Sequence, residues 1–167
     1  MYLIDKKLKH NVRRYIFQCA LAAIAILFIL IILDVFCHSA IIATLGATVF
    51  IVFTMPIARP SHPRQLIGGY IVGIVVGLLF YYISNSILVE SLFGYNGISY
   101  IVFGSLAVGT AIFLMTITDT EHPPAAGIPI ALIFNKWDYL TIIFILSAVI
   151  ILFIIKSLFR PILVDLR

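Results

Sequence analysis

Long runs of apolar residues, separated by short polar connections, make up most of the chain. Five runs are long enough to cross a hydrocarbon core of about 30 Å as helices. They cover residues 15–33, 39–57, 66–89, 98–118 and 139–159. A sixth run, 125–134, spans only about half of that thickness as a helix. The pattern predicts an all-α integral membrane protein with five long transmembrane helices plus one short or broken helix.

Composition supports this interpretation. Apolar residues make up 63% of the 167 residues and charged residues only 11%, whereas soluble domains have about 45–50% and about 25%. These values exclude a soluble enzyme and a nucleic-acid-binding module, although the formal net charge is +4. We therefore expect the lipid bilayer as a partner and no nucleic acid.

The distribution of Lys and Arg predicts the orientation. Five basic residues precede the first run, the connection 58–65 contains Arg59 and Arg64, and three more lie near the C-terminal end. Because cytoplasmic loops are enriched in Lys and Arg, both termini are expected on the cytoplasmic side of a cell (inner) membrane. This orientation requires the run 125–134 to complete a membrane crossing. Lys136 is then the one basic residue expected on the outer side of the membrane. The expected parts are a cytoplasmic basic segment 1–14, a single transmembrane domain 15–160 and a cytoplasmic tail 161–167.

A weak internal repeat has an offset of 60 residues. The stretch 53–63 aligns with 113–123, with Phe, Met, Ile, His and Pro in matching positions. Both copies precede an apolar run of the same orientation, so the sequence suggests a parallel repeat.

The two His-Pro pairs predict helix starts. Proline suits the first position of a helix, and the residue before it is pushed out of the helical region. We therefore expect one helix to begin at Pro63 with His62 as cap, and another at Pro123 with His122 as cap. Helix N-termini attract anions, and a short helix starting near the bilayer midplane is typical of transporter sites. Alternatively, both turns are tight cytoplasmic connections that bind nothing.

Ionisable residues concentrate in these two connections: Arg59, His62, Arg64, Asp119, Glu121 and His122. The metal-binding patterns HxxxH and HExxH do not occur in the sequence, and neither does a serine-nucleophile motif or a phosphate-binding loop. We therefore expect no metal, no cofactor and no enzymatic activity.

Glycines recur at small spacings in the third run. Close helix packing, within the chain or between subunits, is the usual role of small residues spaced by four. The expected packing residues are Gly68, Gly69, Gly73 and Gly77. Six short segments are few for a complete conduction path, so we expect a homo-oligomer packed through glycine faces.

Two motifs resemble those of a known family. The stretch TDTEHPPAAG (118–127) resembles the motif that names the HPP family of small integral membrane proteins, and ARPSHPRQLIGG (58–69) resembles its second marker. The resemblance covers about residues 12–160. The family usually has Pro-Ala-Gly directly after His-Pro, whereas this chain has one more Ala. The matching residues are His122, Pro123, Pro124 and Gly127 in the first motif, and Pro63, Arg64, Gly68 and Gly69 in the second.

The resemblance implies a function only broadly, since some members are linked to nitrite transport and many bacterial members have no assigned role. Our leading hypothesis is a channel or transporter for a monovalent inorganic anion, nitrite first. The expected substrate-binding residues are Arg59, His62, Arg64, His122, Pro123, Pro124 and Gly127. The alternatives are a non-transporting membrane assembly or interaction subunit, and an intramembrane enzyme.

Overall fold

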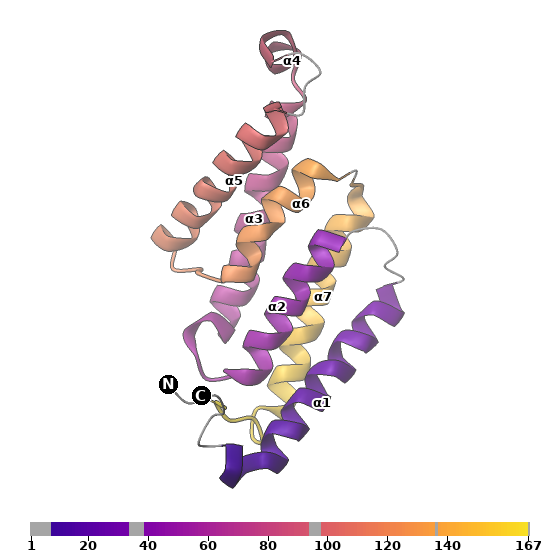
Figure 1. The fold of residues 1–167 in the computed structure, drawn as a ribbon, viewed down its shortest axis with the longest axis vertical. Helices are drawn as coiled ribbons and strands as arrows, with labels where there is room; N and C mark the ends of the chain where they lie inside the picture. The colour runs from indigo at the N-terminus through magenta and orange to yellow at the C-terminus, as the bar shows by residue number, and fades with distance from the viewer. Residues whose placement is uncertain (1–7, 34–38, 94–97, 136, 167) are drawn as a thin grey trace.

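The computed structural model describes residues 8–33, 39–93, 98–135 and 137–166, and the secondary structure of these residues is entirely helical. Figure 1 shows the helices as an elongated bundle, in which η denotes a 3₁₀ helix. In chain order the elements are α1 (Leu8–Leu33), α2 (Ser39–Thr54), η1 (Arg59–Ser61), α3 (Pro63–Ser84), α4 (Ile87–Phe93), α5 (Ile98–Ile117), η2 (Pro123–Gly127), α6 (Ile128–Phe134) and α7 (Tyr139–Phe159).

Four helices are long and apolar enough to cross a membrane, so the chain is a multi-pass integral membrane protein. Two further apolar helices are shorter, Ala40–Thr54 and Pro123–Phe134. The four long spans are Asn11–Ile31, Pro63–Ser84, Ile98–Thr118 and Tyr139–Phe159.

The expected number of long helices was five, and the second run accounts for the difference. α2 ends at Thr54, so its 16 residues rise only about 24 Å. Pro56 lacks the N–H that would continue the helix and disfavours helical backbone at Met55. The run 66–89 also divides, since α3 ends at Ser84 and α4 begins at Ile87.

The short sixth run forms a broken helix, as the sequence predicted. The five residues of η2 lead into the seven residues of α6, and together they rise about 20 Å. α6 ends beside the start of α5, where the rings of Phe134 and Tyr100 lie 6.3 Å apart. Lys136, expected just beyond this helix, lies outside the described residues.

α3 lies at the centre of the bundle, in contact with α5, α6 and α7, while α1 flanks α2 and α7. α2 and α3 run down and up through the view in Figure 1, and α5 and α6 repeat these directions. The two hairpins meet at their connections, where Arg59 and Asp119 form an ion pair across 60 residues. This arrangement agrees with the parallel repeat suggested by the sequence.

Both ends of the described chain lie at one end of the bundle. The Tyr15 hydroxyl donates to the carbonyl oxygen of Leu166, and Leu166 N–H donates to Thr54 O at 2.9 Å. We call this the basal end: it holds the start of α1, η1 and the end of α7. The opposite, distal end holds α4 (Figure 1).

Aromatic rings gather towards the distal end. The ring of Trp137, just before α7, lies 5.2 Å from Tyr81 and 6.2 Å from Tyr82, both near the end of α3. Its indole Nε1 is buried and has no hydrogen-bond partner in the described part of the chain. The Trp137 ring therefore packs against the end of α3.

The glycine face of α3 packs inside the chain. A methyl group added at Gly69 would lie 2.7 Å from His122 Cβ, one at Gly73 would lie 2.7 Å from Ala125 O, and one at Gly77 would lie 3.0 Å from Pro129 Cα. The expectation that this face joins subunits is therefore corrected, because η2 and α6 already cover it. On α5, by contrast, a methyl group at Gly109 would meet no atom within 4 Å.

Candidate functional site

His122 lies at the junction of the two hairpins and is fully buried, with 0% of its surface exposed. It precedes Pro123, the first residue of η2, as the sequence predicted. The imidazole Nδ1 lies 2.9 Å from Pro60 O in η1, and Nε2 lies 2.9 Å from Thr48 Oγ1 in α2. Both ring nitrogens are therefore engaged by other parts of the chain.

These partners fix the direction of the hydrogen bonds around a neutral ring. A carbonyl oxygen only accepts, so Nδ1 carries the proton and Nε2 accepts from the Thr48 hydroxyl. Thr48 Oγ1 in turn lies 2.7 Å from the Tyr70 hydroxyl of α3, and it accepts from that group. The buried chain of donors runs from Tyr70 through Thr48 to His122 and Pro60. It ties α2, α3 and both connections together.

Arg59 and Arg64 converge on one carboxylate. Arg59 forms an ion pair with Asp119 Oδ1, and Arg64 Nη1 lies 3.7 Å from Asp119 Oδ2. Arg64 Nη2 also donates to Thr118 O at 2.8 Å. Both guanidinium side chains are about two-thirds exposed. The pairs hold the two connections together at the surface.

Asp119 ends α5 with a left-handed turn. Its φ is 57°, and Thr120 N–H donates to Met115 O at 2.9 Å. This geometry is the usual C-terminal cap of a helix, and the left-handed position is normally glycine or asparagine.

The contacts of this region do not indicate an anion held by His122 near the bilayer midplane. Its ring bonds to η1 at the basal end, and the nearby Asp119 pairs with the arginines of the same connection. In addition, the helix that follows begins as a 3₁₀ turn.

The other motif residues pack against neighbouring helices. Pro124 is buried, whereas Pro123 is exposed. A methyl group at Gly127 would lie 2.8 Å from Thr44 Cγ2 of α2, and one at Gly68 would lie 2.7 Å from Thr120 Cγ2. The motif therefore allows η2 to approach α2 and α3 closely.

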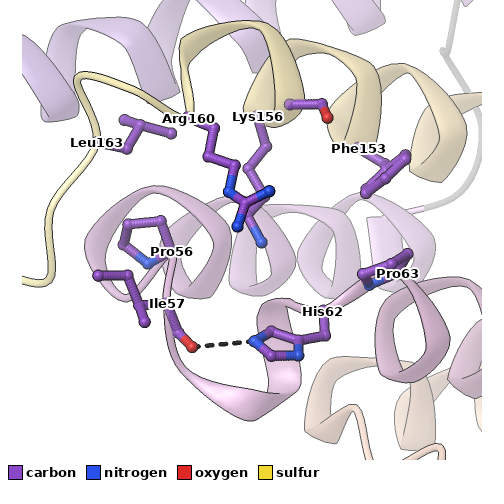
Figure 2. A pocket seen from close by; sticks show the side chains of 9 residues that line it. Pro56, Ile57, His62, Pro63, Phe153, Lys156, Arg160 and Leu163 are labelled. Atoms are coloured by element: carbon purple, nitrogen blue, oxygen red, sulfur yellow. Dashed lines mark hydrogen bonds between the residues drawn. The ribbon is translucent and has the colours of Figure 1, made fainter.

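A cavity of about 250 Å³ lies at the basal end, between the α2–α3 connection and the end of α7. Figure 2 shows the side chains of Lys156 and Arg160 reaching from α7 towards the connection that carries His62. His62 Nε2 lies 3.1 Å from Ile57 O. The lining residues are Pro56, Ile57, His62, Pro63, Phe153, Lys156, Ser157, Arg160 and Leu163.

Lys156 is the buried cation of this cavity. It is 7% exposed, and its ammonium group donates to Ser61 O. Among the described residues, no carboxylate oxygen lies within 4.0 Å of it. The nearby Asp165 instead accepts a hydrogen bond from Ile57 N–H at 2.9 Å. The cavity therefore combines cationic and apolar walls.

Of the predicted site residues, the structure places only His62 on this cavity, while the others lie at the junction of the hairpins. Sequence reasoning missed Lys156 and Arg160 as site residues because it used them only for orientation. Lys156 is the basic residue in the last turn of α7. Lysines at helix ends commonly reach the membrane interface, so the sequence did not distinguish this one as a cavity residue.

The family model described as "HPP, transmembrane region" matches residues 7–163, a range that contains both motifs and the cavity. No curated protein and no solved structure matches the chain.

Proposed function

Because this chain belongs to the HPP family of integral membrane proteins, we propose that it is a channel or transporter for a small monovalent inorganic anion, with nitrite as the first candidate. The substrate class comes from the resemblance, since some family members are linked to nitrite transport. The basal cavity is the observation that supports it in this chain.

The chemistry of the cavity suits an anion. The Lys156 ammonium group has three donors, and Ser61 O takes one of them. Arg160 contributes a second cationic group to the same cavity, and His62 lines it from the α2–α3 connection. A volume of about 250 Å³ also leaves room for several waters at about 30 Å³ each. A partly hydrated anion would therefore fit.

The location of the cavity suggests an entry site. It lies at the basal end, where the basic residues concentrate, and Lys and Arg favour the cytoplasmic side of a membrane. In this proposal Lys156 and Arg160 bind the anion. Arg59, Arg64 and His122 lie outside the cavity, where they join the α2–α3 connection to the α5–η2 connection. The homo-oligomer stays a prediction.

Anion flux into proteoliposomes tests the proposal. Purified protein is reconstituted, and the entry of nitrite, nitrate, chloride and formate is followed with an anion-quenched fluorophore. Arg160→Gln should reduce flux by at least about tenfold, because a hydrogen bond to a charged group contributes about 1.5–3 kcal/mol. Lys156→Met should act in the same direction.

Arg64→Gln is the matched control, since it removes the same charge from the basal end but outside the cavity. Its flux should stay within about twofold of the wild type, because Arg64 does not line the cavity and its charge is screened over about 8 Å at physiological salt. Folded wild-type protein that passes none of the four anions would contradict the proposal. The assembly-subunit alternative would then be preferred.

A further inference from the structure

A second cavity, of about 350 Å³, lies on the other side of the C-terminal stretch, against α1. The anion proposal does not use it. Its walls come from two successive turns of α1 and from the chain that follows α7. The lining residues are Arg13, Arg14, Phe17, Gln18, Pro161, Ile162 and Val164.

The buried amide of Gln18, which is 1% exposed, holds these walls together. Its Nε2 donates to Phe53 O at 2.6 Å and to Val164 O at 2.9 Å. Val164 N–H donates back to Gln18 Oε1 at 3.4 Å. These hydrogen bonds fix the C-terminal stretch against α1. The two walls of the cavity therefore have a defined position relative to each other.

The charges of this cavity have no partner in the described part of the chain. Arg13 and Arg14 are both exposed, and the ion pairs found there involve only Arg59, Arg64 and Asp119. Both arginines follow the kink of α1 at Asn11, where φ is −130° and ψ is 21°. Each guanidinium group is a planar fork of donors that suits the oxygens of a phosphate, and both arginines line the same cavity.

Apolar side chains surround the same arginines. Ile16 is 64% exposed, Phe17 40% and Ile162 58%. In a membrane protein such side chains face acyl chains, while arginines at the helix end reach the headgroups. The cavity thus offers phosphate binding and hydrocarbon contact side by side.

We infer that this cavity binds the headgroup of an anionic phospholipid. The phosphate lies between Arg13 and Arg14, and the acyl chains extend along Phe17 and Ile162. Basic pockets between transmembrane helices on the cytoplasmic side are known to hold such headgroups. The exposed apolar walls favour a lipid over free phosphate, which would gain nothing from them.

Native mass spectrometry of the delipidated full-length protein in detergent tests this inference. The protein is titrated with phosphatidylglycerol and, separately, with phosphatidylcholine. We expect a bound phosphatidylglycerol that is retained preferentially over phosphatidylcholine. Arg13→Gln/Arg14→Gln should weaken its binding about 25-fold, or about fivefold for each arginine, since a basic residue near the surface contributes about 1 kcal/mol.

Arg59→Gln/Arg64→Gln is the matched control, because it removes two exposed arginines from the same end of the molecule. It should leave phosphatidylglycerol binding within about threefold. An equal loss in both double variants would overturn the inference, since attraction would then depend on overall charge. Should the glutamine variant fail to fold, Arg13→Lys/Arg14→Lys retains both charges but loses the fork. It should bind phosphatidylglycerol more weakly than the wild type, and unchanged binding would also overturn the inference.

Competition separates the two sources of phosphate. Inorganic phosphate at millimolar concentration should leave phosphatidylglycerol bound, because it lacks the acyl chains that contact Phe17 and Ile162. Displacement by inorganic phosphate would identify a site for the free anion and overturn the lipid assignment.

Discussion

One imidazole joins three separate parts of this membrane protein. His122 bonds to Pro60 in η1 and Thr48 in α2, and its ring lies 5.6 Å from that of Tyr70 in α3. A polar group buried without a hydrogen bond is costly, so these partners depend on one another. The histidine of the family motif therefore acts here as a tie between hairpins.

His122→Ala should lower stability markedly. It removes one hydrogen bond from Pro60 O and one from Thr48 Oγ1, which keeps Tyr70 as its partner. It also leaves a cavity where the buried ring stood, and each lost hydrogen bond contributes about 0.5–1.5 kcal/mol. We expect a clear drop in the thermal unfolding temperature of the detergent-solubilised protein. His62→Ala is the matched control, since His62 is exposed and makes one bond to Ile57 O. Similar drops in unfolding temperature in both variants would contradict the role of His122 in joining the two hairpins.

Two substitutions of Asp119 separate the contribution of its backbone conformation to stability from that of its charge. Asp119→Gly keeps the left-handed turn and loses two exposed ion pairs, which contribute about 0–1 kcal/mol each. Asp119→Val loses the same pairs and forces a β-branched residue into a conformation that costs about 1–2 kcal/mol or more. We therefore expect only the valine variant to unfold at clearly lower temperature. Equal losses would assign the effect to the ion pairs.

At the scale of the elements, α3 packs closely against η2 and α6. Glycines of α3 make this close approach possible. Backbone atoms of the α5–η2 connection lie against Gly69 and the Ala125 carbonyl of η2 lies against Gly73, with no space for a side chain. Small residues allow such close approach where lipid supplies no hydrophobic driving force between helices. The broken helix is thereby packed against protein.

Gly73→Ala and Gly109→Ala test this contact with the same chemical change. The new methyl group at Gly73 would lie 2.7 Å from Ala125 O, whereas at Gly109 it would meet nothing within 4 Å. Overpacking costs about 1–3 kcal/mol, so Gly73→Ala should lower both the yield and the unfolding temperature. Gly109→Ala should match the wild type. If both variants behave like the wild type, the close packing of α3 is wrong.

The sequence predicted those features of these elements that depend on local chemistry. The starts at Pro63 and Pro123 are confirmed, because proline restricts its own backbone and that of its neighbour. The end of α2 was missed because Pro56 lies inside an apolar run. The partners of His122 could not be predicted, since Thr48 and Pro60 are 74 and 62 residues away. Which polar side chains meet across the bundle depends on its packing.

At the scale of the whole molecule, the start of α1 and the last described residues meet at the basal end. Gln18 and Tyr15 of α1 bond to Val164 and Leu166. The sequence predicts an even number of crossings with η2–α6 as the sixth. This crossing is still a prediction, because only four helices in the described part of the chain have spanning length. The side of the membrane that holds the basal end is still a prediction from the basic residues.

Reporter fusions test this topology. A cytoplasm-active fluorescent reporter fused after residue 167, or before residue 1, should be active in both positions. The same reporter inserted at Leu88 in α4, which is 69% exposed and lies at the distal end, should be inactive. An inactive C-terminal fusion would mean that η2–α6 does not complete a crossing.

The packing of Trp137 against the end of α3 provides an intrinsic fluorescence probe. The chain contains one tryptophan, so its intrinsic emission reports on the distal end alone. Because the indole N–H is buried, emission should be blue-shifted in the folded protein and shift to the red as α6 and α7 separate from α3. Titration of either basal cavity, with nitrite or with phosphatidylglycerol, should leave the spectrum unchanged unless binding alters the packing across the full length of the bundle.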